Sequence, residues 1–316
     1  MSSLETKHLF GLRGVSKHDI RMILDNAKQF REILERPVKK VPSLRGMTVV
    51  NLFFENSTRT RTSFELAEKR LSADTVNFTS SNSSVKKGET LVDTLRNIEA
   101  MKIDIVVVRH KGTGVPKFLA DNSNAIIVNA GDGAHEHPTQ ALLDMLTIEQ
   151  KLGTLEGKNI TIVGDIRHSR VARSNLWGMT TMGAHVTLCG PSTLVPRNRE
   201  LLVNPEVGNV TWEPDLNKAV QNADAIIALR LQKERMDDSL LPSMREYRNT
   251  FGITHEILEK AKDKVLIMHP GPINRGVELD SEIADGEHSV ILEQVTNGVA
   301  VRMAVLYLLA GGRANG

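Results

Sequence analysis

The sequence predicts an α/β protein whose two halves each contain a parallel sheet with helices on both faces. Three observations predict this fold class. The 316 residues are about twice the length of a common single domain. Short β-rich runs alternate with helical patterns, which is the arrangement of βαβ units. The series reaches a long helix at Pro138 and starts again at Asn159, so we place the boundary between the halves near that helix.

The first half begins with an amphipathic helix at Ser16–Leu34. Its apolar residues recur at helical spacing, Ser16 suits the N-cap position, and Pro37 stops the helix. Four β-rich runs follow, and a helical pattern at Glu89–Met101 separates two of them. These runs are Met47–Phe54, Thr75–Thr79, Ile103–Arg109 and Ala125–Asn129.

The second half follows the helix Pro138–Leu152, in which proline occupies the favourable first position. Helical patterns at Val171–Met182 and Leu216–Asn222 separate its strands. The strand candidates are Ile160–Val163, His185–Leu188, Ala225–Leu229 and Val265–Met268. An apolar helix at Gly298–Leu309 ends the pattern, and the pattern does not decide which half it packs against.

Composition excludes several classes of protein. Hydrophobic residues make up 40% and charged residues 25%, as in ordinary globular proteins. A net charge of +2 and 4% aromatic residues give no basis for nucleic-acid binding. The single Cys189 excludes an internal disulfide and a thiolate-rich metal site. The N-terminus lacks a secretory pattern and the apolar run Met303–Ala310 is too short to span a membrane, so we expect a cytoplasmic protein.

The stretch Ser57-Thr58-Arg59-Thr60-Arg61 joins a predicted strand to a predicted helix. Free N–H groups and the dipole at a helix start favour a bound phosphate, and hydroxyl and guanidinium groups add donors. No glycine-rich P-loop is present, so a nucleoside triphosphate is not expected. Taken alone, the stretch is explained equally well as a helix start with exposed arginines.

Polar residues follow five predicted strands, in both halves. Since ligands bind beyond the carboxyl ends of parallel strands, this repetition points to a site rich in arginine and histidine for anionic substrates. His135-Glu136-His137 lacks H-E-x-x-H spacing and an evident third ligand, so no metal is predicted. Gly164-Asp165 would suit a dinucleotide-binding dehydrogenase, but G-x-G-x-x-G is absent.

Five motifs, in one order, give the chain a resemblance to a known family. They are S-T-R-T-R from Ser57, H-P-T-Q from His137, G-D-x-x-x-S-R from Gly164, L-R-x-Q-x-E-R from Leu229 and H-P-G-P from His269. Across essentially its whole length the chain resembles the aspartate/ornithine carbamoyltransferase family. Lys86–Thr90 and Arg230–Arg235 favour the aspartate branch. Pro270 stands where the ornithine branch typically has cysteine, and Gly271 stands where some relatives have leucine.

The resemblance implies transfer of the carbamoyl group of carbamoyl phosphate to L-aspartate in de novo pyrimidine biosynthesis. It implies no cofactor, no covalent intermediate and an active site in the cleft between two domains. Residues 1–138 with the C-terminal helix at 294–316 would bind carbamoyl phosphate, and residues 139–293 would bind aspartate. A carbamoyltransferase for another amine and a catalytically silent binding protein are the alternatives, and the intact motif set argues against the second.

The resemblance also implies residue roles. The phosphate would be bound by Ser57, Thr58, Arg59 and Thr60. The carbonyl oxygen would be bound by Thr60, Arg109 and His137. The carbamoyl NH2 would donate to Gln140 and to the backbone carbonyls of Gly271 and Pro272. Arg170, Arg230, Gln232 and Lys87 would bind aspartate, and Glu55 would pair with Arg170 and Arg235 on domain closure. No general base is evident, and the departing phosphate is one candidate proton acceptor.

In the family, the loop that carries Lys87 reaches the neighbouring subunit's site, so a homotrimer with shared sites is expected. Ser84 would accompany Lys87, with Ser83 as the alternative. Relatives assemble with a regulatory chain, with a dihydroorotase or with neither, and the sequence does not choose among these partners.

Overall fold

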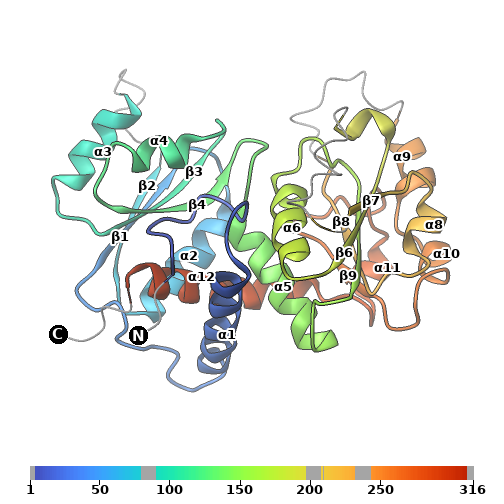
Figure 1. Cartoon of the computed structure of the whole chain (residues 1–316), viewed down its shortest axis with the longest axis horizontal. Helices are drawn as coiled ribbons and strands as arrows, with labels where there is room; N and C mark the ends of the chain where they lie inside the picture. The colour runs from blue at the N-terminus through green and yellow to red at the C-terminus, as the bar shows by residue number, and fades with distance from the viewer. Residues whose placement is uncertain (1–3, 80–89, 197–207, 209, 232–242, 312–316) are drawn as a thin grey trace. The chain divides into compact units, whose positions relative to one another are not determined.

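The computed structural model describes residues 4–79, 90–196, 208, 210–231 and 243–311 (Figure 1). The chain divides into two compact units, which we call unit 1 (residues 1–146 and 296–316) and unit 2 (residues 147–295). The unit boundaries fall inside two helices, α5 (Pro138–Leu152) and α12 (Ile291–Leu309). In the described part of the chain, no helix combines the length and apolar character needed to span a membrane.

Unit 1 contains a four-stranded sheet in the order β2-β1-β3-β4, and every pairing in it is parallel. The strands are β1 (Thr48–Phe53), β2 (Asp74–Thr79), β3 (Ile105–His110) and β4 (Ile126–Asp132). Its helices, besides α12 and the start of α5, are α1 (Lys17–Leu34), α2 (Thr58–Arg70), α3 (Leu91–Glu99) and α4 (Val115–Ala120). Parallel strands need crossover connections, and α2, α3 and α4 supply them.

Helices cover both faces of this sheet, with α3 and α4 on one face and α2 and α12 on the other (Figure 1). Leu95 of α3 and Leu119 of α4 pack with Val50, Val106 and Ile127 in one buried cluster. Because both faces are buried, the strands are almost continuously apolar, which is typical of parallel sheets. Polar side chains are therefore confined largely to the strand ends.

A short N-terminal segment extends the sheet beyond β4. Leu9 forms a parallel bridge with Val128, with N–H···O distances of 3.0 and 2.8 Å on its two sides. The His8 ring nitrogen accepts the Ile127 N–H at 3.0 Å. The start of the chain thus lies against the strand that leads to His137.

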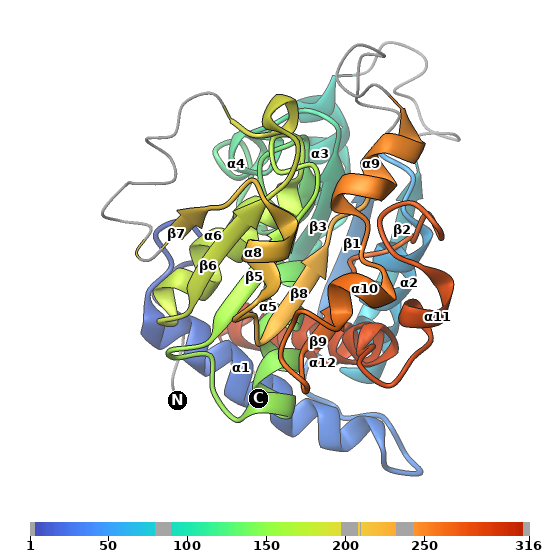
Figure 2. The same ribbon diagram turned by 90° about the vertical axis from the view of Figure 1, so that its right-hand side faces the viewer.

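Unit 2 contains a five-stranded parallel sheet in the order β7-β6-β5-β8-β9 (Figure 2). The strands are β5 (Asn159–Val163), β6 (His185–Cys189), β7 (Val210–Trp212), β8 (Ala225–Ala228) and β9 (Leu266–Met268). Its helices are α6 (Arg170–Thr181), α8 (Leu216–Val220), α9 (Met244–Phe251), α10 (His255–Leu258) and α11 (Ser281–Ala284), with a 3-10 turn at Ser192–Leu194.

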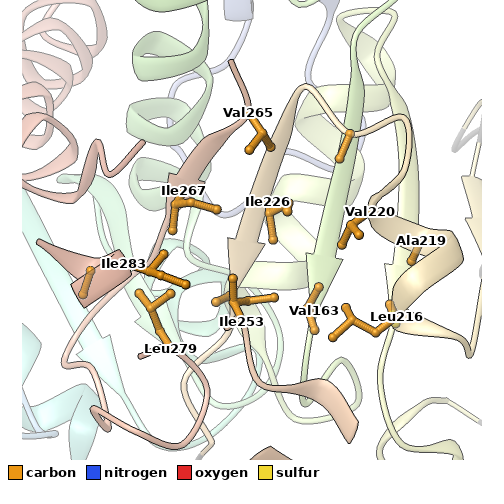
Figure 3. Close-up of a cluster of buried hydrophobic side chains, with 14 residues drawn as sticks. Val163, Leu216, Ala219, Val220, Ile226, Ile253, Val265, Ile267, Leu279 and Ile283 are labelled. Carbon is orange, nitrogen blue, oxygen red and sulfur yellow. The ribbon is translucent and has the colours of Figure 1, made fainter. Parts of the chain in front are cut away.

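One buried cluster lies between this sheet and the helices on one of its faces (Figure 3). Val220 of α8 and Ile283 of α11 pack with strand residues Val163, Ile226 and Ile267, all at most 2% exposed. Side chains along each strand point alternately to this cluster and to the opposite face, where α6 lies (Figure 1). Both sheets are thus covered on two sides, which confirms the fold class predicted from the sequence.

Most predicted elements are present, and one prediction is wrong. α1 begins after Ser16, whose hydroxyl accepts the Asp19 N–H at 3.1 Å, and α5 has the predicted bounds. The C-terminal helix, however, begins at Ile291 rather than Gly298. Gly298 resembles a helix boundary in the sequence, but it is an interior position where a Cβ would lie only 2.6 Å from Arg302 Nη1.

Candidate active site

The hydroxyl-rich and arginine-rich stretch forms the start of α2, as predicted. Ser57 is the N-cap residue, but its side chain makes no capping hydrogen bond, and the first turn contains no acidic residue. Thr58 and Arg59 are exposed and Thr60 is buried. Neutral and cationic donors therefore surround a helix start whose N–H groups and dipole favour an anion.

Arg109 lies next to this helix start because β1 and β3 are neighbours. Phe53 and Arg109 are register partners, and the N–H of the following Phe54 donates to the Arg109 carbonyl at 2.9 Å. Arg109 is only 9% exposed. Its Nη1 donates to the Ala130 carbonyl at 3.0 Å, and its Nε lies 3.5 Å from Glu55 Oε2. The strand end and these contacts fix a buried cation beside the start of α2.

His137 ends the loop between β4 and α5, and its side chain is buried. Its carbonyl accepts the Gln140 N–H at 3.0 Å, which begins the helix. Asn129 Nδ2 donates to Asp132 Oδ1 at 2.8 Å and to the Glu136 carbonyl at 3.3 Å. Side chains on β4 therefore hold the residue that precedes His137.

The Asp132 carboxylate organises the rest of this loop. It accepts the Gly114 N–H at 2.8 Å and the Glu136 N–H at 3.2 Å, and it lies 3.2 Å from His135 Nδ1. Burial alone would raise the pKa of Asp132, yet hydrogen bonds from His135, Gly114 and Asn129 outweigh it and hold that pKa below its ordinary value. An ionised Asp132 is therefore a stable acceptor for the loop.

The Glu136 side chain ties the same loop to the N-terminal segment. Its carboxylate accepts the Leu12 N–H at 2.7 Å and the Arg13 N–H at 3.2 Å. The carboxylate also fills the space where a Cβ on Gly11 would stand. His135-Glu136-His137 is thus built for hydrogen bonding, and the described residues contain no group of three ligand-type side chains suited to a metal ion.

In unit 2, Arg170 is the first residue of α6 and is buried. Ser169 caps this helix by accepting the Ala172 N–H at 3.1 Å. The preceding turn is held by Asp165, whose carboxylate accepts the His168 N–H at 3.1 Å and lies 3.0 Å from His168 Nδ1. Burial is the main cause that raises the pKa of Asp165, and the contacts with His168 oppose it.

Arg230 follows β8, next to the end of β5. Val163 pairs with Ala228, and the Leu229 N–H donates to the Val163 carbonyl at 2.8 Å. Gly164 has a φ of +129°, and its carbonyl lies so close to Gly190 that a Cβ there would collide with it. The positive φ therefore explains the glycine after β5, and the close backbone approach explains Gly190 after β6.

The loop that carries Gly271 and Pro272 follows β9, which pairs with β8. His269 Nδ1 accepts the Gly271 N–H at 2.8 Å, so Nε2 carries the proton in the neutral ring and donates to Glu278 Oε1 at 3.2 Å. Glu278 also accepts the Asn274 N–H at 2.7 Å. A buried histidine and glutamate thus fix the backbone of this loop.

Each unit therefore gathers its predicted residues at the carboxyl ends of neighbouring strands. Arg109 lies at the end of β3, and the start of α2 and His137 follow β1 and β4. Arg170, Arg230 and Gly271 follow β5, β8 and β9. Gln232, Arg235, Lys87, Ser83 and Ser84 lie outside the described residues. The pairing of Glu55 with Arg170 and Arg235 stays a prediction, as does the position of the site between the domains.

Sequence reasoning missed the residues that support the site. Asn129, Asp132 and Glu136 fix the His137 loop, and Glu278 fixes the Gly271 loop through His269. Asn129 and Asp132 have one sequence signal, their position, since buried polar residues at the end of an apolar strand need partners. The identity of a partner such as Leu12, 124 residues away, has no local signal.

Comparisons with known proteins agree with this arrangement. Residues 7–150 match the model of the aspartate/ornithine carbamoyltransferase carbamoyl-P binding domain, and residues 156–309 match that of the Asp/Orn binding domain. The aspartate carbamoyltransferase catalytic subunit of Gemmatimonas aurantiaca is 61% identical over 97% of this chain and 94% of that protein. The catalytic subunit of Cytophaga hutchinsonii is 57% identical over 99% of this chain and 100% of that protein.

Solved structures show the same likeness. Aspartate transcarbamoylase from Trypanosoma cruzi in complex with carbamoyl phosphate has a TM-score of 0.88 at 31% identity, covering 96% of each chain. Ornithine carbamoyltransferase from Pyrococcus furiosus has a TM-score of 0.87 at 28% identity, covering 99% of each chain. The two matching domain models, the close relatives and the shared fold together place this chain in the aspartate/ornithine carbamoyltransferase family.

Proposed function

We propose that this chain transfers the carbamoyl group of carbamoyl phosphate to the amino group of L-aspartate, giving N-carbamoyl-L-aspartate and phosphate. The observation that carries the proposal is the pair of arginine-rich strand-end clusters, one per unit, in a chain 61% identical to an aspartate carbamoyltransferase catalytic subunit. The Trypanosoma cruzi neighbours were solved with carbamoyl phosphate, and with carbamoyl aspartate and phosphate.

Carbamoyl phosphate is assigned to residues 1–138 with the C-terminal helix. Ser57, Thr58, Arg59 and Thr60 at the start of α2 would bind its phosphate. Arg109 and His137, with Thr60, would donate to its carbonyl oxygen. The buried, doubly held guanidinium of Arg109 supports this role, because a fixed donor requires little reorganisation when negative charge develops.

L-Aspartate is assigned to residues 139–293. Arg170 and Arg230 follow neighbouring strands and have forked donors suited to two carboxylates. Gln232 and Lys87 complete the proposed acceptor site. The backbone carbonyls of Gly271 and Pro272 would accept from the carbamoyl NH2, and His269 supports them by fixing the loop.

The proposed chemistry is direct attack by the neutral amine on the carbamoyl carbon. A tetrahedral oxyanion develops, and donors on Arg109, His137 and Thr60 stabilise it; removing one such donor typically costs roughly 3–4 kcal/mol. The bond to phosphate then breaks, Arg59 stabilises the leaving charge, and the departing phosphate takes the amine proton.

The test is to incubate the purified chain with 13C-labelled carbamoyl phosphate and L-aspartate and to follow the label by NMR. We expect labelled N-carbamoyl aspartate, with one phosphate released for each product formed. Labelled cyanate and phosphate as the only products would show decomposition without transfer and would reject the proposal.

We also propose that the active form is a homotrimer in which Lys87, with Ser84 or Ser83, serves the neighbouring subunit. Family membership supports this proposal. Light scattering of active protein should give three times the 34.9 kDa of one chain. Mixing inactive Lys87→Ala and Arg59→Ala subunits should restore part of the activity, whereas mixing Arg59→Ala with His137→Ala should not. Failure of the first mixture after verified subunit exchange would exclude a shared site.

A further inference from the structure

The side chain of Gln140 has its amide orientation fixed by another residue of α5. Gln140 is 9% exposed, and its Nε2 donates to Asp144 Oδ1 at 2.9 Å, one turn further along the helix. An ionised carboxylate can only accept hydrogen bonds, so the NH2 of Gln140 must face Asp144. The carbonyl oxygen of the same amide then points the other way.

Asp144 has no exposed surface, and a buried cation of α12 accompanies it. Burial lowers the pKa of Arg302 to about 10, while attraction by Asp144 opposes that shift, so the guanidinium keeps its charge at neutral pH. Arg302 Nη1 donates to Ser63 Oγ at 3.0 Å and to the Gly298 carbonyl at 2.9 Å. The charge of Asp144 is thus balanced inside unit 1.

The chain makes room for this cation. A Cβ on Gly298 would lie 2.6 Å from Arg302 Nη1 and 3.1 Å from Leu143 Cδ2. The guanidinium carbon lies 5.0 Å from the centre of the Phe64 ring, within the range of a cation–π contact. Ser63 and Phe64 belong to α2, whose first turn carries the proposed phosphate ligands, so Arg302 connects α2 with the Asp144 region.

We propose that Asp144, with its charge balanced by Arg302, is a positioning residue that fixes the Gln140 carbonyl oxygen as an acceptor for the carbamoyl NH2. This inference rests on the proposed function. The Asp144–Gln140 pair would also make the site selective for carbamoyl phosphate. Acetyl phosphate has a methyl group in place of the NH2, so it offers Gln140 no hydrogen, and the oriented amide should favour carbamoyl phosphate over it.

The central variant is Asp144→Asn, whose side chain can both donate and accept and therefore permits either orientation of Gln140. We expect kcat/KM for carbamoyl phosphate to fall about 10- to 100-fold, the value of one buried hydrogen bond. The inhibition constant of acetyl phosphate should change much less. An equal loss for both ligands, or no loss for either, would overturn the proposal.

A double variant separates positioning from folding. Asp144→Asn alone leaves a buried cation without its counter-charge, so stability should fall, and Asp144→Asn/Arg302→Met should recover much of it. Activity toward carbamoyl phosphate should stay low in the double variant. Recovery of both stability and ligand selectivity would show that the pair serves folding alone.

Glu149→Gln provides the matched control. Glu149 is another buried acid of α5, but nine residues separate it from Gln140, about 13 Å along a helix. Its substitution should leave the preference for carbamoyl phosphate unchanged. If the wild-type chain forms no carbamoyl aspartate, the proposed function fails. If it does and Asp144→Asn keeps full selectivity, only the positioning role fails.

Discussion

Arg59 and Arg61 stand two positions apart in one motif, yet their surroundings differ. Arg59 is exposed in the first turn of α2, whereas Arg61 Nε lies 3.5 Å from Glu65 Oε1, one turn further along the helix. An arginine paired with its own helix is mainly a structural group. The family resemblance implies a ligand role for Arg59 and none for Arg61, and the contact of Arg61 with Glu65 supports that distinction.

Arg59→Ala should lower kcat on the order of 10²- to 10³-fold, because a cationic donor to the leaving phosphate is lost. Arg61→Ala removes an ion pair of the helix surface and should change kcat by less than about fivefold. Steady-state kinetics at saturating substrates measure both effects. A near-normal kcat for Arg59→Ala would remove that residue from the mechanism.

Glu68 is a fully buried carboxyl on α2, held by the Asn51 amide at 2.9 Å. Burial is the main cause that raises the pKa of Glu68 from 4.5 to about 7, and the charge of Glu65 acts in the same direction. The hydrogen-bonding groups of Thr75 and Asn51 and the charge of Lys69 lower this pKa but do not outweigh burial. The folded protein therefore holds this proton more tightly than the unfolded chain. The Glu68 carboxyl therefore adds most to the unfolding free energy below pH 4.5. This contribution is lost as the pH rises through 7.

Between pH 5 and 8, the unfolding free energy of the wild type should fall by about 2–3 kcal/mol relative to Glu68→Gln, which cannot titrate. Urea denaturation at several pH values measures this difference. Parallel pH curves for wild type and Glu68→Gln would contradict the account of Glu68.

At the scale of elements, the N-terminal segment belongs to the construction of the His137 loop. Leu9 pairs with β4, and the carboxylate of Glu136 accepts the N–H groups of Leu12 and Arg13. The segment is thus held both beside the strand and beside the loop that the strand leads into. A substitution in this N-terminal segment that moves the His137 loop should therefore lower kcat.

Gly11→Ala should lower both Tm and kcat, because its Cβ would collide with the Glu136 carboxylate. In Gly11→Ala/Glu136→Ala the collision is gone, so the double variant should lose less than the sum of the single losses. Gly11→Ala combined with the distant core variant Ile98→Ala should be additive. If the stability losses of both double variants equal the sums of their single losses, Gly11 and Glu136 are not coupled.

The sequence predicts elements well where periodicity is strong and poorly where tertiary packing decides. α1 and α5 show clear apolar spacing and capping, and they appear as predicted. β7 has three residues and α4 has six, too few for a period to be visible, and neither was predicted. The start of α12 was misplaced because Gly298 serves the packing of Arg302, which no local pattern reveals.

At the scale of the whole molecule, both units use one plan. Apolar parallel strands form a covered sheet, and the residues that follow neighbouring strands carry the polar chemistry. This plan explains why the candidate ligands could be found from the sequence, since they follow recognisable strands. Their supports could not be found in that way, because Glu136, Asp144 and Arg302 act through partners that only folding brings near.

The central claim is that the strand-end arginines serve a carbamoyl transfer to an acidic acceptor. The most direct test is a competition in which one preparation receives carbamoyl phosphate with equal L-aspartate and L-ornithine, and both products are quantified. The account predicts carbamoyl aspartate almost exclusively, because Arg170 and Arg230 match two carboxylates and disfavour a cationic side chain. Predominant citrulline would contradict the acceptor assignment, and neither product from folded protein would contradict the transfer itself.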